Sequence, residues 1–188
     1  SLEIYISGIT HDSRQVQQDF IFCAVKLHRT EESFWYSVSE KEIIEDFFFN
    51  HENFIEEAIS RGAIVIVTEP INLIFITKYP NVTFVFVDHV INFLGEQAST
   101  LSKILDDEII AVTGSAGKTT CVRVLESVIS ELFPEKQVIR MYKYRLTPIT
   151  LPLMYFETLL GDKDFSKRTV ILEMATDNPG CINTLCSI

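Results

Sequence analysis

Apolar runs alternate along the chain with segments whose apolar residues recur at helical spacing. Two runs, at 63–67 and 169–172, are apolar on both faces, which is typical of strands buried in a parallel sheet. Helical spacing marks the segments at 53–61 and 118–133, and Gly62 and Pro134 end these two patterns. The alternation of strands and helices predicts an α/β protein with largely parallel sheets.

Weaker patterns predict the remaining elements. A helix is expected after Asp88, its predicted cap, and runs to about Leu105. The helix at 118–133 carries a predicted core-facing stripe of Val122, Leu125, Val128, Ile129 and Leu132. The other expected elements are strands at 20–25, 82–87, 108–113 and 137–142 and a helix at 151–160.

A polar pair, Asp106-Asp107, separates two sets of strands and helices. Each set is apolar enough to build its own core, since 47% of the chain is apolar and it holds 14 Phe. The pair therefore marks a predicted boundary between domains at 1–106 and 107–188.

Charge excludes several classes of function. The chain has 16 basic and 26 acidic residues and a net charge of −10, which argues against general nucleic-acid binding and against docking on an anionic membrane.

No run reaches the roughly 18 apolar residues of a membrane span, and the first twenty residues lack the pattern of a signal peptide. The four cysteines form no C-x-x-C pair, so we expect reduced thiols in a cytoplasmic protein.

One segment, at 31–52, combines seven acids with clustered aromatic residues. It is interpreted first as a short helix or hairpin with a solvated acidic face and buried aromatics. The alternative is a patch that docks another protein, because exposed aromatic residues mark interfaces.

The strongest chemical signal is Thr113-Gly-Ser-Ala-Gly-Lys-Thr-Thr120, between a predicted strand and a predicted helix. Two glycines allow a tight turn close to an anion, and backbone N–H groups at the helix start attract phosphate. Lys118 can reach β- and γ-phosphates, and the Thr119 hydroxyl can ligate Mg²⁺. This phosphate loop is shorter than G-x-x-x-x-G-K-[ST], which would need Gly where Val112 stands. The predicted nucleotide-binding residues are Gly114, Ser115, Ala116, Gly117, Lys118, Thr119 and Thr120.

Glu173 follows the buried run at 169–172 and should lie at the carboxyl edge of the sheet. A carboxylate there can hold Mg²⁺ beside bound phosphates, so Thr119 and Glu173 are the predicted metal ligands. The plainer alternative for Glu173 is a surface acid.

At these residues the chain resembles the Mur ligases, ATP-dependent amide-forming enzymes of peptidoglycan precursor synthesis. The phosphate loop is similar to their T-G-[ST]-x-G-K-T-T. Leu172-Glu-Met174 and the Gly180-Cys-Ile182 that follows resemble the branch that adds D-alanyl-D-alanine, MurF. The resemblance implies catalytic roles for Lys118 and Glu173 and the cofactors ATP and Mg²⁺.

The N-terminal half resembles the family's UDP-binding domain through Asp12-Ser-Arg14, the run 20–26 and the helix pattern 53–63. The resemblance implies that Ser13, Arg14, Lys26 and His28 bind the UDP end of a UDP-MurNAc-peptide substrate. If the resemblance is set aside, the plain structural alternatives are that Ser13 is a turn residue, that Arg14 forms an ion pair on the surface and that His28 is a solvated loop histidine.

The resemblance implies a small N-terminal α/β domain followed by an incomplete P-loop parallel-sheet domain, so the chain alone lacks parts needed for turnover. Three functions are open. The first is a MurF-like ligase that adds D-Ala-D-Ala through an acyl phosphate. The second is a MurE-type ligase that adds the third peptide residue. The third is a non-catalytic module that binds nucleotide or a protein partner.

Overall fold

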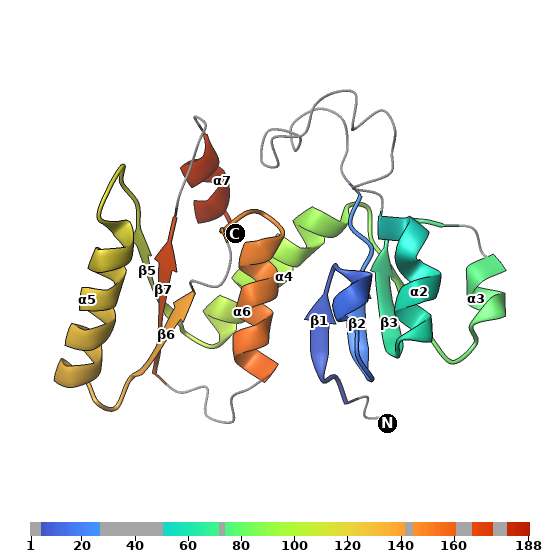
Figure 1. Cartoon of the computed structure of the whole chain (residues 1–188), viewed down its shortest axis with the longest axis horizontal. Helices are drawn as coiled ribbons and strands as arrows, with labels where there is room; N and C mark the ends of the chain where they lie inside the picture. The colour runs from blue at the N-terminus through green and yellow to red at the C-terminus, as the bar shows by residue number, and fades with distance from the viewer. Residues whose placement is uncertain (1–4, 27–50, 72–73, 142–144, 161–166, 175–179) are drawn as a thin grey trace. The chain divides into compact units, whose positions relative to one another are not determined.

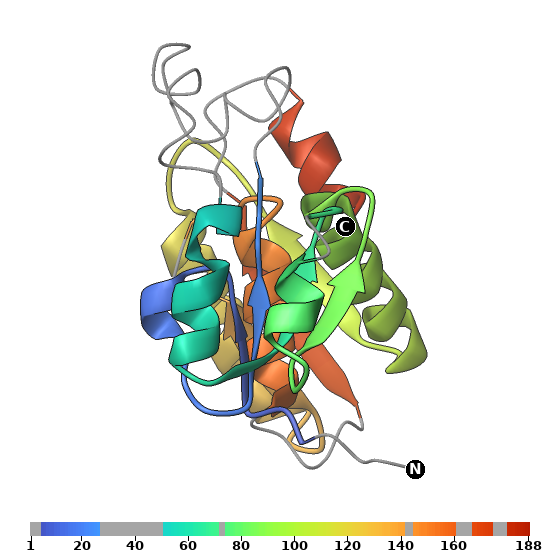
Figure 2. The same ribbon diagram turned by 90° about the vertical axis from the view of Figure 1, so that its right-hand side faces the viewer.

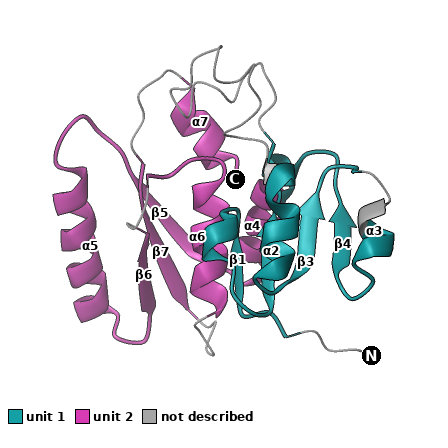
Figure 3. Ribbon diagram, turned by 45° about the vertical axis from the view of Figure 1, so that its right-hand side comes forward, with its two compact units in different colours: residues 1–93 teal, residues 94–188 magenta. Residues whose placement is uncertain are grey.

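In a computed structural model the chain forms two compact units, residues 1–93 and 94–188 (Figure 3). The structure describes residues 5–26, 51–71, 74–141, 145–160, 167–174 and 180–188. Both units combine helices with parallel sheets, which confirms the predicted α/β class. The domain boundary at 106 stays a prediction. The segment at 31–50 lies outside the described residues.

The first unit is built on a parallel sheet whose strands lie side by side in chain order (Figure 1). Phe22, Ile55 and Ile66 are fully buried in its core, where α2 packs on the sheet. Its elements are β1 (Gly8–Thr10), the 3₁₀ helix η1 (Ser13–Gln15), β2 (Phe20–Cys23), the 3₁₀ helix η3 (His51–Phe54), α2 (Ile55–Ser60), β3 (Ala63–Thr68), α3 (Ile74–Lys78) and β4 (Thr83–Phe86).

Helix α4 (Val90–Ile104) crosses the division between the units. The predicted cap at Asp88 is wrong by one residue, because the helix begins at Val90. The ring Nδ1 of His89 accepts a hydrogen bond from the Asn92 backbone N–H at 3.4 Å. A ring nitrogen therefore takes the place of the expected carboxylate at this helix start.

The second unit has a parallel sheet in which the strand that comes last in the chain lies in the middle, in the order β5-β7-β6. Helix α5 covers one face, and α6 and α7 lie on the other (Figures 1 and 3). The elements are β5 (Glu108–Val112), α5 (Lys118–Leu132), β6 (Gln137–Met141), α6 (Thr150–Leu160), β7 (Arg168–Glu173) and α7 (Cys181–Cys186). All residues of β7 before Glu173 are buried, as the apolar run predicts.

The predicted core face of α5 is only partly correct. Val122 is buried, and Leu125 and Ile129 are half-buried. Val128 and Leu132 are 44% and 66% exposed. The three described strands cover the middle of the apolar stripe and leave its flank and the last helical turn in contact with solvent.

A buried polar cluster joins the turn before β5, helix α6 and the start of β7. Nε of Arg168 lies 3.2 Å from Oδ1 of Asp107, and neither side chain has exposed surface. The Tyr155 hydroxyl donates to Oδ2 of Asp107 at 2.6 Å, and Nη2 of Arg168 donates to the Thr158 hydroxyl at 2.9 Å. The predicted polar break at Asp106-Asp107 is thus a chain turn whose second carboxylate points into the protein. Asp106 adopts a positive φ of 53°.

Candidate functional site

The phosphate loop, residues 113–120, joins the end of β5 to the first turn of α5. Gly114 has φ +151° and Gly117 has φ +77°, backbone conformations that L side chains rarely adopt. A Cβ on Gly117 would meet no atom within 4 Å, so backbone conformation rather than space requires glycine there. Residues 113–117 are exposed, so their backbone groups are open to a ligand.

Lys118 folds back over the loop. Its Nζ donates a hydrogen bond to the carbonyl oxygen of Gly114 at 2.6 Å. Gly117 caps α5, and the Cys121 backbone N–H donates to its carbonyl at 2.9 Å. The ammonium group and the N-terminus of α5 therefore face the same loop, where both would attract phosphate oxygens.

Thr119 and Glu173 meet although they are far apart in sequence. The Thr119 hydroxyl donates to Oε1 of Glu173 at 2.8 Å. Val112 pairs with Glu173 across the β5–β7 ladder, and the Met174 N–H donates to the Val112 carbonyl at 2.9 Å. This pairing brings the carboxyl end of β7 next to the loop that follows β5.

The Thr119–Glu173 pair fits a magnesium ion. A hydroxyl and a carboxylate converge, and Mg²⁺ prefers oxygen ligands, often one or two from protein and the rest from phosphate and water. Among the described residues no group of three or more His, Cys, Asp or Glu side chains could hold a metal ion. A cation here would therefore need phosphate oxygens or water in addition to these two side chains.

The residues predicted to bind UDP lie in the first unit. Ser13 is buried, and its hydroxyl donates to Oε2 of Glu57 at 2.7 Å. The Arg14 guanidinium donates two hydrogen bonds to the Asp12 carboxylate, at 2.9 Å and 2.7 Å. Lys26 is half-buried just beyond β2, and His28 lies outside the described residues. Ser13 and Arg14 are thus neighbours in η1, and their contact with a substrate stays a prediction.

Two acids that the sequence does not mark as site residues, Asp12 and Glu57, hold these two side chains. The Arg14 hydrogen bond is the main cause that lowers the pKa of Asp12 below its usual value. The pKa of Glu57 is also lowered, first by the Ser13 hydroxyl and then by Arg61. The i,i+4 spacing of Glu57 and Arg61 could have predicted their ion pair, but no local pattern reports the contact between Glu57 and Ser13.

No helix in the described part of the chain is both long and apolar enough to span a membrane.

An α/β fold with a glycine-rich loop between strand and helix is typical of nucleotide-binding proteins. No model of a known protein family matches the chain. Curated proteins similar to it are named UDP-N-acetylmuramoyl-L-alanyl-D-glutamate–2,6-diaminopimelate ligase. The one from Caldanaerobacter subterraneus subsp. tengcongensis is 28% identical over 131 residues, and the one from Clostridium tetani is 30% identical over 133 residues. These matches cover 67% and 70% of this chain but only 22% and 23% of the relatives.

Solved structures with a similar fold include a MurF ligase from Thermotoga maritima in complex with ADP. It has a TM-score of 0.66 at 24% identity, and the match covers 95% of this chain and 34% of that one. A MurF from Acinetobacter baumannii gives 0.67 at 22% identity, covering 95% and 32%. The chain is thus similar in sequence to a third or less of the length of these ligases and similar in fold to MurF structures. The relatives carry the name of one branch and the solved structures that of another.

Proposed function

We propose that this chain is the substrate- and nucleotide-binding portion of an ATP-dependent amide ligase of peptidoglycan precursor synthesis. The observation that carries the proposal is the contact between Thr119 and Glu173 beside the phosphate loop. It joins the two side chains that the sequence predicts as ligands of a nucleotide-bound cation. The likeness to Mur ligases supports the reaction class.

In this proposal the protein positions ATP and neutralises its charge. Backbone N–H groups at 115–119 bind phosphate oxygens, and Lys118 exchanges the Gly114 carbonyl for the β- and γ-phosphates. Thr119 and Glu173 hold Mg²⁺, which neutralises negative charge on the phosphates when it is bound. Transfer of the γ-phosphate to a substrate carboxylate makes an acyl phosphate, and the incoming amine then displaces phosphate. Lys118 and Glu173 are the proposed catalytic residues.

The first unit is proposed to bind the UDP end of a UDP-MurNAc-peptide through Ser13, Arg14, Lys26 and His28. Arg14 offers a guanidinium that Asp12 now holds in a fixed position, and its side chain is 79% exposed. A diphosphate could pair with that guanidinium from the solvent side. We propose a cytoplasmic location, where these small-molecule substrates are made, and a protein contact through the segment 31–52.

Two branches compete for the second substrate. The residues 172–174 favour the ligase that adds D-Ala-D-Ala, whereas the names of the curated relatives favour the one that adds diaminopimelate. The full natural protein should be assayed for amide formation with both pairs of substrates, D-Ala-D-Ala with UDP-MurNAc-tripeptide and diaminopimelate with UDP-MurNAc-dipeptide. Product with one pair identifies the branch. ATP binding with no product from either pair would instead support a non-catalytic nucleotide-binding module.

The proposed role of the Thr119–Glu173 pair is tested by the Mg²⁺ dependence of ATP binding in the variant Glu173→Gln. Loss of a contact to a charged group costs about 1.5 kcal/mol, so we expect about tenfold weaker ATP binding with Mg²⁺. Binding in EDTA should change little. Glu131→Gln is the matched control, because it removes the same charge from an exposed position on α5. Equal Mg²⁺ dependence in the two variants would return Glu173 to the role of a surface acid.

A further inference from the structure

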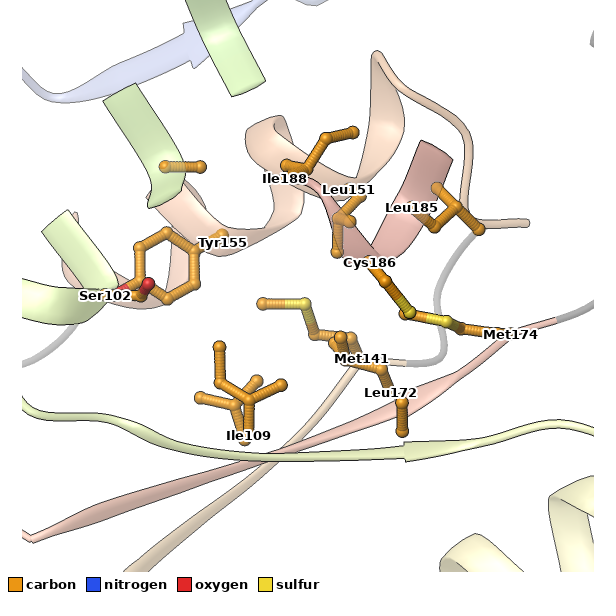
Figure 4. Close-up of a pocket in the computed structure, with 13 residues that line it drawn as sticks. Ser102, Ile109, Met141, Leu151, Tyr155, Leu172, Met174, Leu185, Cys186 and Ile188 are labelled. Carbon is orange, nitrogen blue, oxygen red and sulfur yellow. The ribbon is translucent and has the colours of Figure 1, made fainter. Parts of the chain in front are cut away.

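A pocket of about 300 Å³ lies within the second unit, on the face of the sheet opposite α5 (Figure 4). Met141, Leu172 and Met174 line it from the strands and the residue after β7, and Tyr155 lines it from α6. Cys186 of α7 lines it as well and is exposed. Its position at the solvent side makes Cys186 a natural reporter of what enters.

The lining is apolar because its hydroxyl groups are engaged elsewhere. The Tyr155 hydroxyl donates to Asp107 at 2.6 Å, so the ring alone is left for the pocket. The Ser102 hydroxyl donates to the Ser99 carbonyl at 3.0 Å. None of the residues that line the pocket carries a charged side chain. A polar ligand would therefore lose hydrogen bonds to water on entering and find no replacement.

The pocket is separate from the phosphate loop, although both touch β7. Side chains alternate along a strand, so Leu172 and Met174 share one face and Glu173 takes the other. Glu173 bonds to Thr119 of α5, which covers that second face. A molecule in the pocket would therefore not compete with nucleotide phosphates.

We propose that this pocket binds a small, neutral, apolar molecule of about two rings. An apolar cavity of about 150 Å³ holds one benzene, and this one is about twice that size. Charge favours a neutral ligand over a fatty-acid anion, because the chain has a net charge of −10 and the lining offers no base. The two flexible methionines let the walls adapt to the shape of the ligand.

The experiment is thiol footprinting with naphthalene as the probe. The chain is alkylated with N-ethylmaleimide, and the rate at each cysteine is followed by mass spectrometry. Cys121 is the internal control, because it is the other exposed cysteine and lies at the start of α5. Naphthalene at twice its dissociation constant should slow alkylation of Cys186 about threefold and leave Cys121 unchanged. Equal rates at Cys186 with and without naphthalene, or equal slowing of both thiols, would overturn the proposal.

A pocket-filling variant makes the test specific. Ser102→Leu adds volume inside the lining, so naphthalene should no longer protect Cys186. Ala111→Leu serves the same purpose from β5 if the first variant fails to fold. Ser130→Leu adds the same side chain at an exposed position of α5 and should keep the protection. Protection of Cys186 that instead rises with protein concentration in the absence of naphthalene would show that a second copy covers the pocket, and would overturn the proposal.

Discussion

Lys118 folds back over the loop that precedes it. Its ammonium group donates to the Gly114 carbonyl at 2.6 Å, in a loop whose neighbouring residues are exposed. A phosphate that enters the loop offers the ammonium group a charged acceptor in place of a neutral carbonyl, and charge-assisted hydrogen bonds are about twice as strong as neutral ones. In the proposed function, the side chain therefore already lies at the loop that would bind the anion.

Lys118→Ala should therefore weaken ATP binding about tenfold or more, since a contact between charges is lost at a cost of about 1.5–3 kcal/mol. The fold should be kept, because the lysine bonds only to an exposed loop carbonyl. Isothermal calorimetry measures the affinity, and Lys136→Ala is the control, a lysine of the same unit that pairs with Glu108. Equal affinities in the two variants would remove Lys118 from the nucleotide site.

His11 gives the first unit a pH dependence. Burial lowers the pKa of this histidine below its usual 6.5, and the smaller effect of the Asp12 charge opposes the shift. The unfolded chain therefore binds a proton at a higher pH than the folded unit does, and stability is lost as pH falls from 6.5 through the lowered pKa. The first unit should unfold at a lower temperature at pH 5.5 than at pH 7.5.

Comparing the parent with His11→Gln isolates the contribution of His11 to the pH dependence of the first unit's stability. Asp12 and Glu57 have lowered pKa values too, but carboxyl groups titrate below this pH range. The variant should therefore show a flatter dependence of melting temperature on pH between 5.5 and 7.5, followed by circular dichroism. An unchanged slope would show that another group binds the proton.

At the residue scale the sequence predicts the geometry of the glycine-rich loop better than that of the first unit's candidate site. Gly114 and Gly117 lie close together on a short stretch, so their spacing predicts the tight turn that the structure shows. The meeting of Thr119 with Glu173 also follows, once β5 and β7 are neighbours. The bond between Ser13 and Glu57 could not be predicted, because it depends on how η1 packs against α2.

At the scale of elements, the buried Asp107–Arg168 pair joins the start of β7 to the turn before β5. Arg168 also lies over the Tyr155 ring, with 5.7 Å between its Cζ and the ring centre. Burial and the bond to Asp107 raise the pKa of Tyr155 above its usual value, so the hydroxyl stays a donor at neutral pH. The turn before β5, helix α6 and strand β7 are thus joined by one cluster at the end of the sheet opposite the phosphate loop.

Arg168→Met should destabilise the second unit by about 3–5 kcal/mol, because it leaves the Asp107 carboxylate buried without its cation. Tyr155→Phe removes one hydrogen bond to the same carboxylate and should cost about 1.5–3 kcal/mol. Lys136→Met breaks an exposed pair instead and should leave the unfolding midpoint close to the parent value. Denaturant unfolding ranks the three variants, and equal midpoints for Arg168→Met and Lys136→Met would contradict a stabilising role for the cluster.

The sequence predicts an element correctly where its apolar pattern is continuous. It fails to predict the burial of a side chain where that burial depends on residues distant in sequence. The run at 169–172 is apolar on both faces, and β7 is the buried middle strand of its sheet. Val128 and Leu132 have core spacing as well, yet both are exposed, because a helix stripe does not report how wide a sheet it meets. The burial of Asp107 was missed for the same reason, since its cation lies in a strand that is distant in sequence.

At the scale of the whole molecule, the two compact units each have their own sheet and core, so each should unfold as its own cooperative transition. Calorimetry of the parent chain should resolve two unfolding transitions, and the melting temperature of each should respond to a different perturbation. Arg168→Met should lower one of them and leave the other, because the buried pair lies wholly in the second unit. Lowering the pH from 7.5 to 5.5 should lower the transition that Arg168→Met spares, because His11 lies in the first unit. A single transition that responds to both changes would show that the two units unfold together as one cooperative structure.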